Sequence, residues 1–161
     1  MSYVEPIIKK SLERADFTSL YIDLCNSYSN FDNGKNIKKA DIKSFLDKEG
    51  LQYKIAGSEN CFYRDYDFEK FKLRFLVGYK HGFIDALYNF WNDDFSIRVL
   101  GGFKTYCEMT DPDFDQKVKY RFPISCSESM ATEIILKVLE LHERFLTEFK
   151  ENYKNYLQQS L

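Results

Sequence analysis

Residues 68–79 read FEKFKLRFLVGY, and this stretch decides the fold class. Large apolar side chains alternate with lysine and arginine side chains, at Phe71, Leu73, Phe75, Val77 and Tyr79. A period of two is typical of a β-strand with one buried face and one exposed face. We therefore predict a strand here, followed by a turn at residues 80–82, where a glycine can adopt positive φ.

The residues after this strand predict an antiparallel meander. Apolar runs continue to residue 122 and are separated by turn-like sequences at 92–94 and 101–102. Strands that are joined by short turns pair as antiparallel neighbours. We predict about five strands, at residues 71–79, 83–91, 95–100, 103–109 and 118–122. Residues 51–55 also alternate as a short strand, and residues 61–67 suit either another strand or an edge loop.

Helical spacing flanks the predicted sheet on both sides. Residues 4–28 predict one helix, or two helices broken near Asp16, and residues 39–49 predict a short helix that ends at Gly50. Pro123 stops strand pairing, and the sequence at 125–128 has the S-x-x-E form of a capping box. Apolar residues then keep helical spacing to Tyr156, which predicts a helix of about 30 residues.

The chain is therefore predicted to be an α+β protein with one domain, residues 1–161. Within it, residues 1–50 form a helical part, 51–123 an antiparallel sheet and 125–157 a long helix. The apolar parity of each element predicts a core that includes Phe75, Val77, Ile97, Val99, Ile135, Val138 and Phe145.

Composition narrows the function classes. The net charge of −2 argues against a dedicated nucleic-acid binder, because the affinity of that class depends on basic charge. The four cysteines are far apart and form no CxxC pair, so we predict thiols and no metal site. The first 15 residues are too charged for a signal peptide, and no apolar run is long enough to span a membrane. We expect a cytoplasmic protein that has no membrane contact and needs no cofactor.

No motif for catalysis is present. His81 lies in a predicted turn, and His142 lies on or beside the apolar stripe of the last helix, and neither has a neighbouring nucleophile in the sequence. The sequence also lacks a nucleophile elbow, a zinc-protease motif and a phosphate loop. We therefore predict a protein that is not an enzyme. Catalysis would require one of the two histidines to face a cavity beside a cysteine or a carboxylate.

Acidic residues form the candidate partner-binding site. Residues 108–115 contain no basic residue, and two further aspartates occupy the predicted turn at 92–94. Such a cluster suits either solvated turns or a docking surface for a basic partner. We expect Trp91 and Tyr106 to add apolar contacts. The candidate residues are Asp93, Asp94, Glu108, Asp111, Asp113, Phe114 and Asp115.

The two acidic groups adjoin only if residues 95–109 form a hairpin with its tip at 101–102. The second candidate surface is basic, and its residues are Lys35, Lys38, Lys39, Lys43 and Lys48.

The order of elements, the size and the composition resemble the immunity proteins of bacterial toxin–immunity systems, including those of contact-dependent growth inhibition. The resemblance implies a protein that binds a cognate toxin domain, often a nuclease, and blocks its active site without catalysis or a cofactor. The build also resembles helix-grip folds, in which aromatic residues line a small-molecule cavity between a curved sheet and the C-terminal helix. A packed sheet face favours the first function, and a deep apolar cavity under the helix favours the second.

Overall fold

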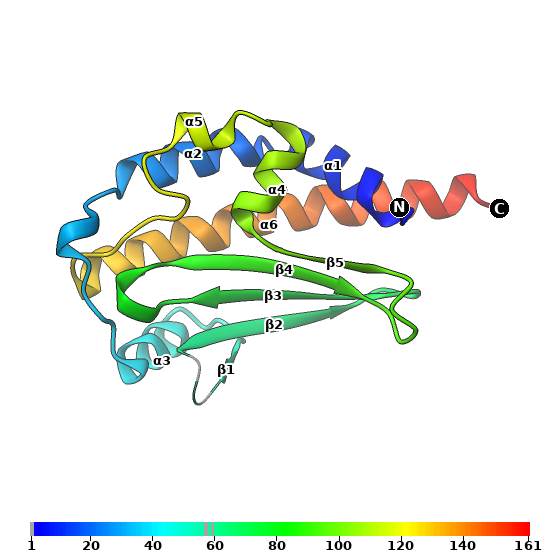
Figure 1. Cartoon of the computed structure of the whole chain (residues 1–161). Helices are drawn as coiled ribbons and strands as arrows, with labels where there is room; N and C mark the ends of the chain where they lie inside the picture. Colours follow the sequence, from blue (N-terminus) through cyan, green and yellow to red (C-terminus); the bar gives the residue numbers. More distant parts are fainter. Residues whose placement is uncertain (1, 57, 59) are drawn as a thin grey trace.

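The computed structural model describes residues 2–56, 58 and 60–161. Helices come first, then a sheet, then a long C-terminal helix (Figure 1). The three N-terminal helices are α1 (Val4–Arg14), α2 (Phe17–Ser27) and α3 (Lys39–Lys48). The C-terminal helix α6 (Glu128–Gln159) has 32 residues and confirms the predicted long helix. The chain is an α+β protein.

Five strands form one antiparallel sheet in the order β1-β2-β3-β4-β5. Each strand pairs with the next strand along the chain, so that Phe75 lies opposite Arg64 on one side and Tyr88 on the other. The predicted antiparallel meander is therefore confirmed. The strands are β1 (Lys54–Ala56), β2 (Cys61–Asp67), β3 (Lys72–Gly78), β4 (Asp85–Trp91) and β5 (Arg98–Gly102).

The position of the sheet in the sequence differs from the prediction. The first two strands lie before residue 68, where the sequence signal was weak, and the sheet ends at residue 102. The predicted strand at 103–109 is helix α4 (Phe103–Thr110), and residues 118–122 follow the short helix α5 (Phe114–Lys117) without regular structure. The predicted turn at 101–102 is the end of β5, which leads directly into α4.

Tertiary contacts explain why α4 is helical. The buried residues Phe103, Tyr106 and Cys107 share one face at helical spacing. The Tyr106 hydroxyl donates to the main-chain oxygens of Tyr88 (3.0 Å) and Val99 (3.2 Å), and this contact holds α4 against β4 and β5. A strand over the same residues would place Tyr106 on the opposite face from Phe103 and Cys107.

Side chains of helix α2 hold the end of α5 and the segment 118–122 by hydrogen bonds to main-chain oxygens. The hydroxyl of Tyr21 donates to the main-chain oxygen of Arg121 (3.0 Å), and the amide of Asn26 donates to that of Lys117 (2.9 Å). The segment thus crosses to the helical layer, and β5 is left as an edge strand of the sheet.

The core lies between the sheet and α6, which runs along the sheet on the same side as α1, α2, α4 and α5 (Figure 1). On β3, Leu73, Phe75 and Val77 are buried while the residues between them are partly exposed, which confirms the predicted parity. All seven predicted core residues are buried: Phe75, Val77, Ile97, Val99, Ile135, Val138 and Phe145.

Local signals at the helix ends are partly confirmed. The backbone of Asp16 is left-handed (φ 53°) and separates α1 from α2, and Gly50 has a φ of 67° just after α3. The N-cap of α6 is Ser127, whose hydroxyl accepts a hydrogen bond from the Met130 amide (3.1 Å). Ser125, the first residue of the predicted capping box, is buried and donates instead to the main-chain oxygen of Ser127 (2.6 Å).

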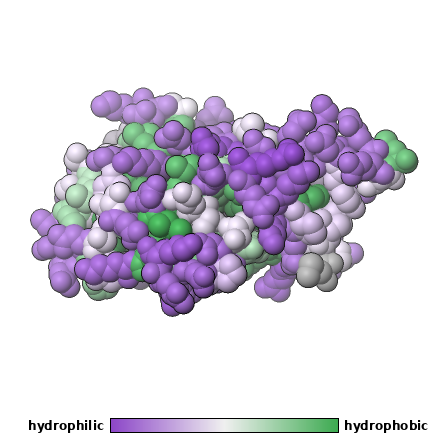
Figure 2. All heavy atoms as spheres, turned by 90° about the horizontal axis from the view of Figure 1, so that it is seen from above, coloured by the Kyte–Doolittle hydropathy of each residue, from purple (hydrophilic) through white to green (hydrophobic). Residues whose placement is uncertain are grey.

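The surface is mostly polar. Seen from the side of α2 and α5, it is mainly hydrophilic, with small hydrophobic patches between the polar side chains (Figure 2). Within the described residues, no helix combines the length and the apolar character that crossing a membrane requires.

Candidate functional site

His142 is fully buried between the sheet and α6. Its Nε2 lies 2.8 Å from the Tyr66 hydroxyl, and its Nδ1 lies 2.9 Å from the Tyr88 hydroxyl. The imidazole ring also stacks on Phe75, with ring centroids 3.8 Å apart. A neutral imidazole has one donor and one acceptor, so one tyrosine donates to it and the other accepts from it. Both ring nitrogens are satisfied by the protein itself.

The surroundings keep His142 neutral. Burial, together with the positive charges of Arg64 and Lys150, lowers the pKa of His142 to about 3. Burial also raises the pKa of Tyr66 to about 12 and that of Tyr88 well above its ordinary value. Around pH 7 these three groups therefore carry no charge. The arrangement stabilises the sheet–helix interface, because the imidazole and both tyrosine hydroxyls satisfy one another in the core.

Burial also dominates the environment of the cysteines. Cys25, Cys61 and Cys107 are buried, and Cys126 is half-buried. Desolvation raises the pKa of Cys25 to about 12 and raises that of Cys107 as well, so both side chains are thiols at neutral pH. Among the described residues, no group of three or more His, Cys, Asp or Glu side chains lies close enough to hold a metal ion.

Three of the four acidic candidate residues in the 108–115 segment are paired with cations from outside that segment. Lys104 lies 3.2 Å from Glu108 and 3.7 Å from Asp115, and Arg121 lies 3.3 Å from Asp115. Asp111 pairs with Lys117. These exposed ion pairs reduce the negative field that was expected from the sequence.

Two aromatic residues expected at the acidic surface lie in the core. Phe114 and Tyr106 are both fully buried, and Phe114 stacks with Tyr21 at a centroid distance of 6.1 Å. A partner cannot contact them without rearranging the core, so the expectation for these two side chains is corrected. Phe114 is buried against Tyr21 of α2, and Tyr106 is buried against β4 and β5.

The acidic residues also fall into two separate groups. Asp93 and Asp94 lie in the turn between β4 and β5, at the end of the sheet opposite to α5 (Figure 1). The side chain of Asp94 accepts a hydrogen bond from the Ser96 amide (3.0 Å), which fixes the turn. The two acidic groups were expected to adjoin through a hairpin with its tip at 101–102. β5 runs directly into α4 instead, so this hairpin does not form and the two groups lie apart.

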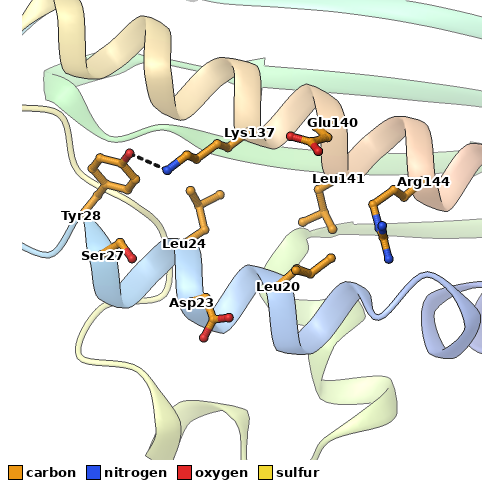
Figure 3. A pocket seen from close by; sticks show the side chains of 9 residues that line it. All are labelled: Leu20, Asp23, Leu24, Ser27, Tyr28, Lys137, Glu140, Leu141 and Arg144. Carbon is orange, nitrogen blue, oxygen red and sulfur yellow. Dashed lines mark hydrogen bonds between the residues drawn. The ribbon is translucent and has the colours of Figure 1, made fainter.

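A surface groove lies between α2 and α6. It has a volume of about 290 Å³, and Leu20, Leu24 and Leu141 supply its apolar floor (Figure 3). At one end, Lys137 donates to the Tyr28 hydroxyl (3.0 Å), so that the groove is bridged there.

The opposite end and the rim of the groove are charged. Arg144 donates to the main-chain oxygen of Ala15 (3.2 Å) and marks the second end. Asp23 on α2 and Glu140 on α6 also line the groove, and within the described residues neither forms an ion pair. Seven residues of α6 separate Lys137 from Arg144, so the groove is about 10 Å long. A single apolar or amphipathic side chain of a partner fits these dimensions.

The sequence contained a weak signal for this groove. Phe17, Tyr21 and Cys25 form the buried stripe of α2, and Leu20 lies beside this stripe. The apolar surface of α2 is therefore wider than one buried face. Leu20 is 39% exposed, whereas Phe17 is completely buried. The pairing of α2 with α6, which are more than 100 residues apart, could not be predicted from that pattern.

No protein-family model matches the chain, no curated protein matches it, and no solved structure matches it. What the chain does is therefore inferred from its own residues and their geometry.

Proposed function

We propose that the chain is a non-catalytic binding protein whose partner is another protein. More narrowly, we propose an immunity protein that binds a cognate bacterial toxin domain and occludes its active site. The observation that supports this proposal is the contrast between a filled interior and an open groove with an apolar floor on the surface.

The filled interior favours a protein partner over a small molecule. A small-molecule site between the sheet and α6 would need the space that His142, Phe75 and Tyr88 occupy. Tyr88 also stacks on Phe145, with ring centroids 4.8 Å apart. These side chains are all completely buried, so a ligand could enter only by displacing them.

The α2–α6 groove supplies the features of a protein interface. Leu20 and the buried leucines offer an apolar floor for an anchor side chain, which is the kind of contact that holds a complex after encounter. The unpaired carboxylates of Asp23 and Glu140 favour a basic partner, such as the substrate cleft of a nuclease. The acidic residues of 108–115 could assist the approach of that partner, although their ion pairs weaken this effect.

Co-expression with a candidate toxin domain, chosen from any secreted toxin encoded beside this gene, tests the proposal. The wild-type chain is expected to protect the growth of the cells, and the purified proteins are expected to form a complex in which the toxin is inactive. Leu20→Arg should weaken protection, because it fills the groove and adds a positive charge. Leu136→Arg is a matched control, because Leu136 is an exposed leucine of α6 outside the groove.

Three outcomes would contradict the proposal at different levels. Stable binding without protection would support a binding protein and contradict the immunity function. The absence of any complex between the purified proteins, together with unprotected growth, would remove this toxin as the partner. Equal effects of Leu20→Arg and Leu136→Arg would show that the groove is not the interface.

A further inference from the structure

The two edges of the sheet differ in how they are protected. An edge strand exposes unpaired backbone groups, and proteins usually protect such edges with short strands, charges or proline. β1 has only three residues, whereas β5 has five residues and contains neither lysine nor proline. β5 also carries Leu100, whose side chain is 55% exposed. Among the described strands only β4 pairs with β5, so its outer edge is open.

The backbone groups that face this open edge can be identified. Asn92 donates its amide to the main-chain oxygen of Ile97 (3.3 Å), which makes this pair a hydrogen-bonded one. Hydrogen-bonded and non-hydrogen-bonded pairs alternate along an antiparallel ladder. The backbone groups of Val99 and Gly101 therefore point toward β4, and those of Arg98 and Leu100 point outward together with the amide of Gly102, whose carbonyl begins α4.

Two unpaired charges of opposite sign lie beside this edge. Arg98 and Asp85 are exposed on the sheet face that α6 does not cover, and within the described residues neither forms an ion pair. On the same face, Arg74 is fully paired, because it donates two hydrogen bonds to the carboxylate of Asp65 (2.7 and 2.9 Å). Arg98 and Asp85 are therefore two charges of opposite sign next to β5 that lack an ion-pair partner within the described residues.

Gly102 leaves room between these charges. A β-carbon at this position would lie 3.5 Å from Oδ1 of Asp85, so the carboxylate is next to the bare backbone of Gly102. The surrounding protein atoms desolvate this carboxyl and raise the pKa of Asp85. A cation placed over Gly102 would stabilise the charged form of Asp85.

We propose that two copies of the chain associate through β5, which pairs antiparallel with β5 of the partner subunit about a two-fold axis at Leu100. The dimer then contains one continuous antiparallel sheet. This inference goes beyond the proposed function and does not depend on it.

The register of this pairing uses the open backbone groups at the centre of the edge. Leu100 lies opposite Leu100 of the partner subunit and exchanges two backbone hydrogen bonds with it, and the amide of Gly102 donates to the carbonyl of the partner's Arg98. Arg98 lies opposite Gly102 of the partner subunit, so the guanidinium reaches Asp85 of the partner subunit. The two-fold axis repeats this ion pair, and the same surface is complementary to itself.

An apolar hollow next to the edge adds to the contact area. It has a volume of about 270 Å³ and is lined by Asn89, Trp91, Phe95, Arg98 and Leu100. Phe95 is 63% exposed and has a φ of 57°, a left-handed backbone conformation that is rare for a bulky residue. The hollow and the open edge share Arg98 and Leu100, so the dimer covers both features at once.

The mass in solution tests the dimer. Light scattering after size exclusion, over a range of concentrations, should give twice the 19.2 kDa chain mass for the wild-type protein. Leu100→Lys should give the monomer mass, because it places two like charges opposite each other at the axis. Leu136→Lys is the matched control and should stay dimeric, because Leu136 is an exposed leucine of α6.

A charge swap tests the register. Arg98→Glu and Asp85→Lys should each raise the dimer dissociation constant about tenfold or more. The double variant should bring it back toward the wild-type value, because the charges are exchanged and the pairing is restored. Circular dichroism of each variant checks that the fold is retained.

A wild-type protein that stays monomeric over the whole concentration range would overturn the dimer. So would an unchanged dimer in Leu100→Lys, because the interface would then lie elsewhere. A double variant no better than the two single ones would overturn the register. None of these results affects growth protection, so a failure of the dimer and a failure of the proposed function can be told apart.

Discussion

His142 is a buried titratable residue whose hydrogen-bond partners only the structure reveals. The sequence places it on or beside an apolar stripe, and the structure shows both ring nitrogens bonded to tyrosine hydroxyls in the core. The energetic cost of protonating this histidine is therefore high in the folded chain and low in the unfolded chain. The free energy of unfolding should therefore depend on pH.

The first prediction concerns pH. The folded-state pKa of His142 is about 3 and the unfolded value is about 6.5, so the unfolded chain binds more protons between these values. This histidine should make the free energy of unfolding fall as the pH drops from about 6.5 toward 3, by at most about 1.4 kcal/mol per pH unit. Urea titrations at several pH values measure the slope.

His142→Gln provides the comparison, because glutamine keeps a donor and an acceptor but does not titrate. Its unfolding free energy should depend less on pH than that of the wild type over the same window. Carboxylates contribute equally to both proteins and cancel in the difference. Identical slopes for the two proteins would contradict the burial of a neutral histidine.

A second prediction at the residue scale concerns the start of α6. Ser127→Ala removes the hydroxyl that accepts from the Met130 amide, and should lower the free energy of unfolding by about 1 kcal/mol. Ser129→Ala is the control, because Ser129 is exposed in the first turn and its hydroxyl does not cap the helix. If both changes have the same effect, Ser127 is not the cap.

At the scale of the elements, α1 is attached to the last turns of α6 by a buried polar contact. Asn152 is 4% exposed, donates to the Ser11 hydroxyl (3.0 Å) and accepts from Arg14 (3.3 Å). The hydroxyl of Ser11 in turn donates to the main-chain oxygen of Ile7 (2.7 Å). Nearby, Tyr3 stacks on Tyr156 with ring centroids 5.0 Å apart. The long helix is therefore covered by α1 over part of the length that extends beyond the sheet.

The third prediction tests this contact. Asn152→Ala should lower the free energy of unfolding by about 1–3 kcal/mol, because it removes two hydrogen bonds in a buried setting. Amide hydrogen exchange should show that protection is lost first in α1 and in the last turns of α6. Asn155→Ala is a matched control three residues later on the same helix. Loss of protection spread evenly over the sheet would contradict a local role for Asn152.

At the scale of the whole molecule, the question is which surface binds a partner. The α2–α6 groove offers unpaired carboxylates at Asp23 and Glu140, whereas Asp111 is paired with Lys117. Charge in an interface mainly changes the rate of association, and added salt reduces this effect. The two surfaces can therefore be compared by charge reversal.

The fourth prediction states the expected ranking against the cognate toxin domain. Asp23→Lys with Glu140→Lys should slow association about tenfold at low salt, and the effect should shrink at high salt. Asp111→Lys with Asp113→Lys should slow association less, although more than it speeds dissociation. The measurement is association and dissociation kinetics at two salt concentrations.

The reverse ranking would place the interface at residues 108–115. If neither double variant changed the kinetics, the exposed lysines of residues 35–48 would become the next surface to test. Lys39 and Lys43 line a hollow of about 320 Å³ there, beside Leu51 and Tyr53.

The sequence by itself determined the fold class, the meander and the long C-terminal helix. These features depend on local periodicity, and the predicted core residues Phe75, Val99 and Phe145 are all buried. Residues 103–110 were assigned to the wrong element, because Phe103 and Cys107 suit a period of two as well as a helix. Only the hydrogen bonds from the Tyr106 hydroxyl to β4 and β5 decide between them.

Tertiary structure alone decided the candidate surfaces. Three of the four carboxylates of 108–115 form ion pairs with Lys104, Lys117 and Arg121, which lie outside that run and reach it only in the fold. The α2–α6 groove joins residues more than 100 positions apart. Periodicity reports which side of an element is buried, because that depends on neighbours in the chain. It does not report which elements meet, because that depends on how the buried faces pack together.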